Sequence, residues 1–229
     1  MICRIADLTV SVPEAGGMAS RCRDYLTDCQ APIDIEIREE SYEPHRWATL
    51  DYDRMCYMES GELFYLNLLR FNGMMLHASA VVYEGKAYLF SGPCGVGKST
   101  HKDLWLQTFG EKARVINDDK PALRLVDGQW YAYGTPWCGK DGINLNERAP
   151  LGGICFLKQG KENRIRRLEK AEAIAMLMFQ THHRFGKVQN LDYLLNQIGS
   201  LVENIPIFEL ENFPGPEAVQ LSSGTMTKA

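Results

Sequence analysis

The segment SGPCGVGKST, residues 91–100, has residue types and spacing that suit phosphate binding. Gly92, Gly97, Lys98 and Ser99 fit the pattern G-x-x-x-x-G-K-[ST] without a mismatch. In this pattern the glycines let backbone N–H groups point at phosphate oxygens, the lysine reaches the β- and γ-phosphates, and the hydroxyl holds Mg²⁺. The alternative is a glycine-rich turn that binds nothing. The predicted nucleotide-binding residues are Gly92, Pro93, Cys94, Gly95, Val96, Gly97, Lys98, Ser99 and Thr100.

Two adjacent carboxylates, Asp118 and Asp119, follow the short apolar run ARVIN. A strand, the glycine loop, a helix and a second strand would return the chain to the same sheet edge, where ligands of open sheets bind. One carboxylate could then hold a metal ion together with Ser99, and the other could accept a proton from an attacking hydroxyl. The sequence leaves open which aspartate is the base, and a solvated turn is the alternative for both.

The elements that would position these residues alternate between strands and helices. Residues 76–83 and 87–91 predict a β-hairpin that runs directly into the loop, and residues 98–109 predict a helix that ends before Gly110. A three-residue turn makes this strand pair antiparallel, which differs from the parallel βαβ start of GTPases and motor ATPases. A second hairpin is expected around Asp127-Gly128, with strands 121–126 and 129–134.

The remaining patterns predict a small β-rich N-terminal region and further helices. Ile33, Ile35 and Ile37 alternate with polar residues, as in a half-buried strand. The segment 60–73 predicts a helix with Ser60 as its N-cap and Gly73 as its stop. Further strands are expected at GGICFL, RIRRL and PIFELE, and helices near 169–183, 191–203 and 215–222. The fold class is therefore α/β or α+β with a mixed, partly antiparallel sheet, and the chain divides at residues 58 and 59.

The composition excludes several classes of protein. The 229 residues carry a net charge of −4, so a nucleic-acid partner is not expected. No apolar run is long enough to cross a membrane, and the N-terminus does not have the pattern of a signal peptide. Seven cysteines without a CxxC pair are expected to be free thiols of a cytoplasmic protein.

The hairpin opened by His77, the glycine loop and the aspartate pair together resemble the catalytic domain of HPr kinase/phosphorylase. That domain shares a P-loop superfamily with the phosphoenolpyruvate carboxykinases, in which the loop also follows an antiparallel strand of a mixed sheet. The motifs cover about residues 75–125, and the segment from TPWCGK to GGICFL resembles a set of shorter bacterial HPr-kinase-like proteins. Cys94 stands where the family usually carries a serine, and the family's HPr-docking segment is not recognisable.

The resemblance implies a small N-terminal region over residues 1–58 and a P-loop kinase domain over residues 59–229. It implies ATP and Mg²⁺ as cofactors, with Asp118, Asp119, Lys98 and His77 at the catalytic centre and Ser99 and the aspartates on the metal. His77 lies near the phosphates in the family, although a lone histidine at a strand start can also be structural. The family includes kinases of peptide serines and kinases of small hydroxyl compounds.

Two basic positions are weaker candidates for substrate contacts. Lys140 follows a glycine in an expected loop and could contact phosphate or acceptor charge, or lie on the surface. Arg166 belongs to the basic stretch 161–170, which could receive an acidic substrate or form a solvated strand face. The expected function is an ATP-dependent kinase of a small hydroxyl compound or of a peptide serine. A module that binds ATP for regulation is the alternative. The acceptor and the oligomeric state, a homo-oligomer included, stay open.

Overall fold

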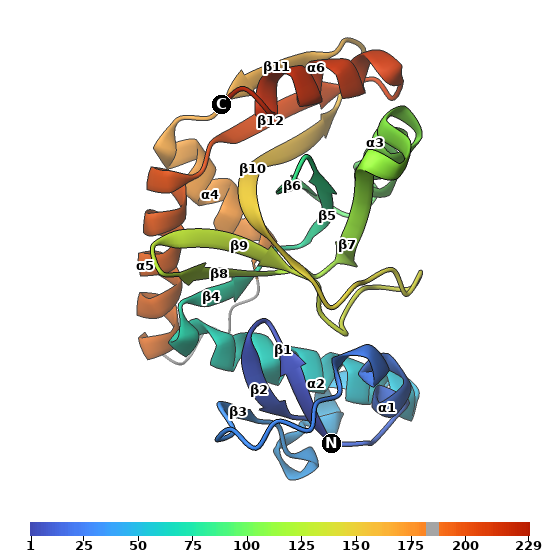
Figure 1. Ribbon diagram of the computed structural model, residues 1–229, viewed down its shortest axis with the longest axis vertical. Helices are drawn as coiled ribbons and strands as arrows, with labels where there is room; N and C mark the ends of the chain where they lie inside the picture. Colours follow the sequence, from blue (N-terminus) through green and yellow to red (C-terminus); the bar gives the residue numbers. More distant parts are fainter. Residues whose placement is uncertain (182–187) are drawn as a thin grey trace.

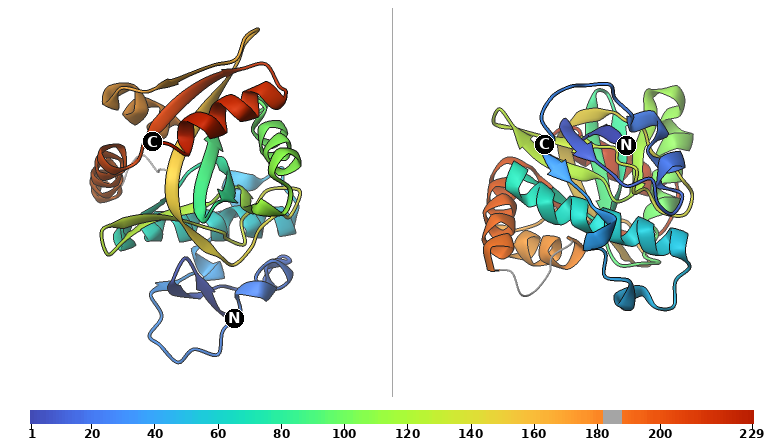
Figure 2. Two further views of the ribbon diagram at one scale, coloured as in Figure 1. Left: turned by 45° about the horizontal axis from the view of Figure 1, so that its top comes forward. Right: turned by 90° about the horizontal axis from the view of Figure 1, so that it is seen from below.

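The computed structural model describes residues 1–181 and 188–229. Figure 1 shows a small sheet and short helices below the long helix α2 (Tyr52–Leu68), with a larger curled sheet and its helices above. The small sheet contains β1 (Ile2–Ile5), β2 (Leu8–Ser11) and β3 (Ile35–Glu36). The short helix α1 (Met18–Arg21) lies beside it (Figure 2). The predicted mixed α/β class is confirmed.

Within the described residues, nine strands form the larger sheet, in the order β4-β8-β9-β10-β6-β5-β7, with β12 added to β10 and β11 to β12. The hairpin strands are β5 (Ala78–Tyr83), β6 (Lys86–Ser91), β8 (Ala122–Val126) and β9 (Gln129–Tyr133). The others are β4 (Gly73–Met75), β7 (Ala113–Asp119), β10 (Arg148–Gln159), β11 (Arg164–Arg167) and β12 (Ile207–Asn212). Strand β6 pairs antiparallel with β5 and parallel with β10, so the sheet is mixed as expected.

Helices cover both faces of this sheet. Helix α4 (Lys170–Gln180) and helix α5 (Val188–Asn204) bury Leu177 and Leu201 against one face. Helix α3 (Lys98–Phe109) and helix α6 (Pro216–Met226) bury Trp105 and Val219 against the other. A third apolar cluster joins α2 to the small sheet and also includes Trp137. The edge that carries the glycine loop is therefore built on a core packed from both sides.

Several element boundaries differ from the sequence predictions, including the end of α2, which lies at Leu68 and not at Gly73, the first residue of β4. Helix α2 begins at Tyr52, because the Asp51 carboxylate caps the Arg54 N–H, and the expected cap Ser60 lies inside the helix. The Ser60 hydroxyl instead accepts a hydrogen bond from Trp137. Ile33 lies outside β3 and is 48% exposed. The helix expected over 169–183 ends at Gln180, and its last expected residues, 182 and 183, lie outside the described residues. The division at residues 58 and 59 stays a prediction, and both residues belong to α2.

The seven cysteines are all free thiols. Five of them are buried, and Cys29 and Cys94 are exposed. A search of the described residues finds no helix with the length and apolar character needed to cross a membrane.

Candidate functional site

A cleft of about 430 Å³ lies at the edge of the sheet where β6 and β7 end. Both strands pair antiparallel with β5, so they run in the same direction and their C-terminal ends meet at one edge. Most of the predicted site residues line this cleft, while Gly92, Pro93 and Val96 form the base of the loop outside it. Its lining residues are His77, Cys94, Gly95, Gly97, Lys98, Ser99, Thr100, Asp118, Asp119, Cys138, Gly139, Lys140 and Asp141.

The glycine loop has a backbone that few other residues could adopt. Gly92, Gly95 and Gly97 have φ angles of 140°, 79° and 107°, which favour glycine. A Cβ on Gly92 would also lie 3.1 Å from the Leu157 carbonyl oxygen. Gly97 is the N-cap of α3, and no side chain caps the first N–H groups of this helix. These amides can therefore bind an anion.

Lys98 lies over the same loop. Its Nζ donates to the carbonyl oxygens of Gly92, at 2.9 Å, and Pro93, at 3.1 Å. Burial lowers the pKa of Lys98, because the charged ammonium loses hydration in the cleft. An anion bound by the loop would provide the opposite charge that the two carbonyls only partly supply.

Asp118 is 7% exposed and is held by two polar side chains. The Ser79 hydroxyl donates to Oδ1 at 2.5 Å, and Lys102 Nζ donates to Oδ2 at 2.9 Å. Burial alone would lower the pKa of Lys102, but its bonds to Asp118 and Asp103 raise it. The arrangement fixes the carboxylate rigidly at the end of β7.

Asp119 follows with a strained backbone and a side chain that reaches the cleft. Its φ is 126°, a region that non-glycine residues rarely occupy. Its Oδ2 accepts from Lys120 Nζ at 2.5 Å, and His77 Nε2 lies 3.3 Å from Oδ1. Burial opposes ionisation, yet the bonds from His77 and Lys120 lower the pKa of Asp119 to about 2. The other ring nitrogen of His77 lies 3.2 Å from Gln180 Oε1.

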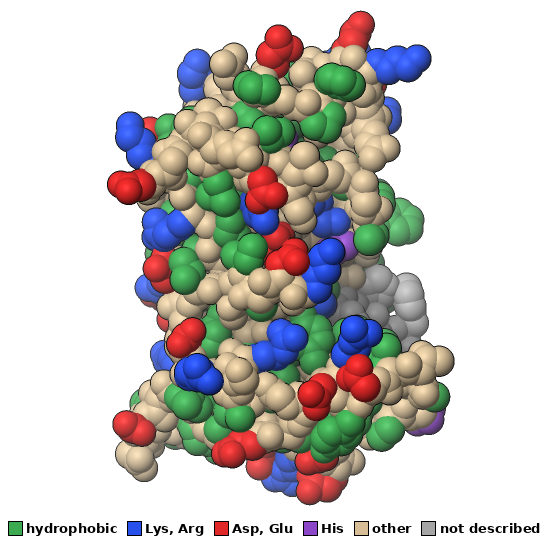
Figure 3. All heavy atoms as spheres, turned by 90° about the vertical axis from the view of Figure 1, so that its right-hand side faces the viewer, with side chains coloured by type: hydrophobic (Ala, Val, Ile, Leu, Met, Phe, Trp, Pro, Cys, Tyr) green, Lys and Arg blue, Asp and Glu red, His purple; other side chains and the backbone are tan. Residues whose placement is uncertain are grey.

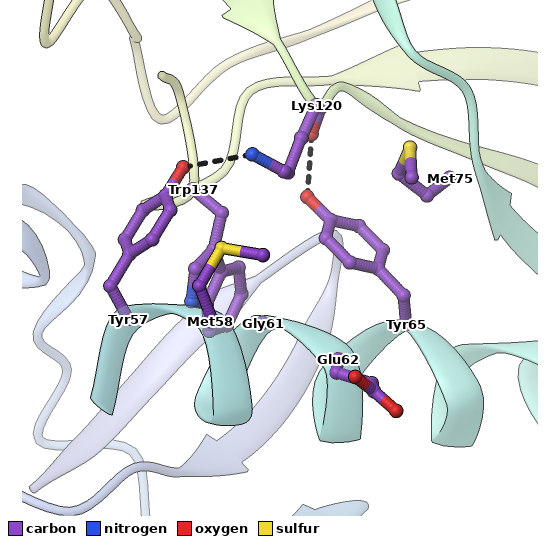
Figure 4. Close-up of a pocket in the computed structure, with 8 residues that line it drawn as sticks. All are labelled: Tyr57, Met58, Gly61, Glu62, Tyr65, Met75, Lys120 and Trp137. Carbon is purple, nitrogen blue, oxygen red and sulfur yellow. Dashed lines mark hydrogen bonds between the residues drawn. The ribbon is translucent and has the colours of Figure 1, made fainter. Parts of the chain in front are cut away.

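Helix α2 supports the Asp119-Lys120 segment from below, as Figure 4 shows. The Tyr57 hydroxyl lies 3.2 Å from Lys120 Nζ and also accepts from the Gly139 N–H at 3.1 Å. The Tyr65 hydroxyl donates to the Lys120 carbonyl oxygen at 2.5 Å. Gly139 has a φ of 76°, and a Cβ there would lie 2.9 Å from the Asp119 Cβ. The loop that contains Gly139 therefore packs directly on Asp119.

The structure separates the two basic candidates. Lys140 lines the cleft, is exposed and has no ion-pair partner among the described residues. Arg166 does not line it, because it lies on β11 and pairs with Glu172 at 2.8 Å and Glu209 at 3.1 Å. Its charge is already balanced by two carboxylates on neighbouring elements.

Sequence reasoning missed four residues of this site, namely Ser79, Lys102, Lys120 and Tyr57. Two signals were available: Lys102 follows Lys98 by one helical turn, and Ser79 occupies a strand that the hairpin places near the loop. No comparable signal connects Tyr57 to the aspartates, because 63 residues separate it from Lys120.

Metal binding can be tested against the donors present. Among the described residues, no group of three or more His, Cys, Asp or Glu side chains could hold a metal ion. Mg²⁺ bound with a nucleotide needs only one or two carboxylates, because phosphate oxygens and water complete its shell. Each oxygen of Asp118 and Asp119 keeps a free lone pair beside its present hydrogen bond. The donor set thus fits a nucleotide-bound Mg²⁺ and does not fit a metal held by protein alone.

The fold and the cleft define a mixed α/β protein with a glycine loop and an acidic pair at one sheet edge. Residues 48–213 match the family described as SynChlorMet cassette protein ScmC, and the chain belongs to this family. A search of curated proteins finds no match. Among solved structures, the HPr(Ser) kinase/phosphatase from Coxiella burnetii is similar with a TM-score of 0.37 and 12% identity. The similarity covers 67% of this chain and 94% of that one.

Proposed function

We propose that this protein is an ATP- and Mg²⁺-dependent kinase that transfers the γ-phosphoryl group to a hydroxyl. The observation that carries the proposal is the convergence of the glycine loop, Lys98 and the two aspartates on one cleft. Each feature alone has a structural explanation. Together they provide the phosphate-binding and acceptor-orienting groups that phosphoryl transfer requires.

The roles of the donor-side residues follow from their positions. The N–H groups at the start of α3 and the Lys98 ammonium bind phosphate oxygens and offset the charge that develops on them. The Ser99 hydroxyl and the Asp118 carboxylate would hold Mg²⁺, which would offset phosphate charge. Lys102 and Ser79 orient that carboxylate, since they bind one oxygen each. Bound Mg·ATP supplies the phosphoryl group.

Asp119 is the residue we assign to the acceptor. Both carboxylates line the cleft and have a partner on each oxygen, but the Asp118 side chain is buried, whereas the Asp119 side chain is 30% exposed and so is the more accessible to an acceptor. A carboxylate with a pKa of about 2 is a weak base, so its main contribution is to accept the hydroxyl's hydrogen bond and orient the oxygen. His77 and Lys120 hold it in that position.

The acceptor oxygen forms a bond to the γ-phosphorus, the bond from that phosphorus to the bridging oxygen breaks, and ADP leaves. The hydroxyl proton departs late, first along the hydrogen bond to Asp119 and then to solvent. In a loose transition state little of the proton has been transferred to the base, which is consistent with the low pKa of the Asp119 carboxyl.

The test measures ADP release from Mg·ATP with pools of small hydroxyl compounds and of serine peptides. Lys98→Ala serves as the blank. Asp119→Asn should lower turnover at least about 100-fold while ATP affinity stays within a few fold, because the neutral amide is a weaker hydrogen-bond acceptor that cannot take the hydroxyl proton, and the loop stays intact. Asp127→Asn is the matched control, since Asp127 also has a positive φ but lies in the β8–β9 turn.

Equal turnover in Asp119→Asn and the wild type would remove the role assigned to Asp119. ATP binding that depends on Lys98, without ADP release from any acceptor pool, would favour the alternative of a regulatory module that binds ATP and transfers nothing.

A further inference from the structure

A second cavity of about 390 Å³ adjoins the cleft and shares Gly139 and Lys140 with it. Its floor is formed by Tyr57 and Lys120, the residues that hold the Asp119 segment. Its opposite wall comes from the N-terminal region, through Gly16 and Arg21. A volume of this size is typical of sites for small ligands. The cavity therefore extends from the N-terminal region to Lys120, the neighbour of Asp119, and to the residues that it shares with the cleft.

The glycines of this wall bring the N-terminal region close to α2. Gly16 has a φ of 53°, and a Cβ there would lie 2.5 Å from the Cβ of Cys56 on α2. The adjacent Gly17 also has a positive φ and lines the cavity without a side chain. Met18 and Cys22 are fully buried and fix α1 on this packing. Arg21, between them, points to the cavity from a rigid support.

The cavity has an excess of positive charge. Arg21, Arg54, Lys120 and Lys140 line it against the single acid Asp53, an excess of three. Lys120 pairs with Asp119, and Arg54 lies 3.5 Å from Asp51. Arg21 and Lys140 have no ion-pair partner among the described residues. In Figure 3, Lys and Arg side chains gather on this face between the N-terminal region and the body above it.

Arg21 is arranged to bind an anion. Its guanidinium lies 4.5 Å from the centre of the Tyr57 ring, so the ring supports the flat face of the group. The N–H edge of a guanidinium held in this way stays available, and it matches the two oxygens of a carboxylate or phosphate. Tyr57 in turn contacts Lys120 next to Asp119. The Tyr57 ring thus contacts both Arg21, which would bind the anion, and Lys120, which pairs with Asp119.

We propose that this cavity binds the phosphate acceptor, and that the acceptor carries an anionic group, carboxylate or phosphate, near its hydroxyl. The proposal rests on the proposed kinase function. Arg21 and Lys140 bind the anionic group, and the hydroxyl lies toward Asp119. The N-terminal region then contributes directly to the choice of substrate, from a position outside the matched family segment 48–213.

The experiment compares acceptors that differ in charge. Glycerate and glycerol 3-phosphate are compared with glycerol, and a peptide with Asp next to its serine is compared with the Asn peptide. Binding to the Mg·ADP-loaded protein is measured by calorimetry, and KM and kcat are measured with Mg·ATP. The charged probes should bind at least about 10-fold more tightly, because an arginine contact to a charged group has that magnitude. The affinities for glycerate and glycerol 3-phosphate show whether the anionic group is a carboxylate or a phosphate. The affinities for the two peptides show whether that group lies on a polypeptide.

Two variants assign the effect to this cavity. Arg21→Gln should raise the Kd and KM of the charged probe about 10-fold, with a smaller change in kcat. The Kd and KM of neutral glycerol should stay the same. Lys140→Gln should act in the same direction from the other side of the cavity. Arg23→Gln is the matched control, because Arg23 is exposed, lies two residues away and does not line the cavity.

Three outcomes would overturn the inference: equal affinity for charged and neutral probes, no binding of any charged probe to the nucleotide-loaded protein, or equal behaviour of Arg21→Gln and Arg23→Gln. Failure of the kinase proposal gives a different result. In that case Mg·ATP is not bound, or is not consumed with any acceptor, in an assay with Lys98→Ala as the blank.

Discussion

Asp119 combines a strained backbone with a stabilising side chain, and substitution can separate the two. Its φ of 126° costs about 1–3 kcal/mol for a residue with a Cβ. Asn at this position keeps that strain and loses the carboxylate charge. Gly loses the charge as well but adopts this φ without a steric cost. Both variants therefore lose the carboxylate charge, but only the Gly variant also relieves the backbone strain.

The charge contribution follows from the pKa. Hydrogen bonds from His77 and Lys120 outweigh burial and lower the pKa of Asp119 from 3.8 to about 2. At 1.36 kcal/mol per pKa unit this difference stabilises the folded state by about 2 kcal/mol at neutral pH. Because the folded pKa is the lower one, the contribution is complete above pH 3.8 and disappears as the pH falls through about 2.

Asp119→Asn should therefore be about 2 kcal/mol less stable than the wild type at pH 7, and the gap should shrink to about half at pH 3. Asp119→Gly should be about 1 kcal/mol more stable than Asp119→Asn, after about 1 kcal/mol is deducted for the flexibility of glycine in the unfolded chain. Both variants should lose at least about 100-fold in turnover.

Urea denaturation followed by tryptophan fluorescence measures these differences, since Trp105, Trp130 and Trp137 are fully buried. A Gly variant that is less stable than the Asn variant would refute the strain argument. A gap between wild type and Asn variant that is unchanged from pH 7 to pH 3 would refute the charge argument.

Two further predictions concern the support of the aspartates. Lys102→Met should cost about 3 kcal/mol of unfolding free energy, because it leaves the buried Asp118 carboxylate without its cation, and adding Asp118→Asn should recover part of that loss in the same urea assay. Gly139→Ala and Gly142→Ala, at φ angles of 76° and 66°, should each lose at least about 1 kcal/mol in thermal or urea unfolding, and Gly139→Ala should lose more because of its added contact. Only Gly139→Ala should also lower kcat, because its Cβ would lie 2.9 Å from the Asp119 Cβ while that of Gly142 meets nothing within 4 Å.

The elements around the loop could be predicted because their signals are local. Helix α3 has the bounds that the sequence indicated, since the glycine motif starts it and Gly110, with a φ of 54°, ends it. The hairpin of β5 and β6 follows from a short turn between two apolar runs. The N-cap of helix α2 was predicted nine residues too late, at Ser60 instead of Asp51. It lies between two layers and buries polar residues such as Glu59 and Ser60, which hides its periodicity.

The residues of the candidate site also divide into those that local sequence signals place and those that only the fold brings together. The aspartates could be placed beside the loop because β6, α3 and β7 follow one another directly in the chain. Tyr57 could not be placed there, because its bond to Lys120 crosses 63 residues and no pattern connects the two. Arg166 does not line the cleft. Its basic stretch suggested a substrate contact, but Glu172 and Glu209 come from a helix and a strand that only the fold brings to it.

The same distinction explains why the acceptor is harder to predict than the nucleotide. The proposed donor-side residues lie within one continuous stretch, from Gly92 to Asp118, and a motif marks those of the glycine loop. The second cavity takes its residues from four separated segments: 16–21, 50–58, residue 120 and 139–140. None of these segments has a motif, and a glycine pair fixes the position of the first by packing against α2. If Arg21 selects the acceptor's charge, substrate choice can change by substitutions in the N-terminal region while the phosphate-binding loop stays the same.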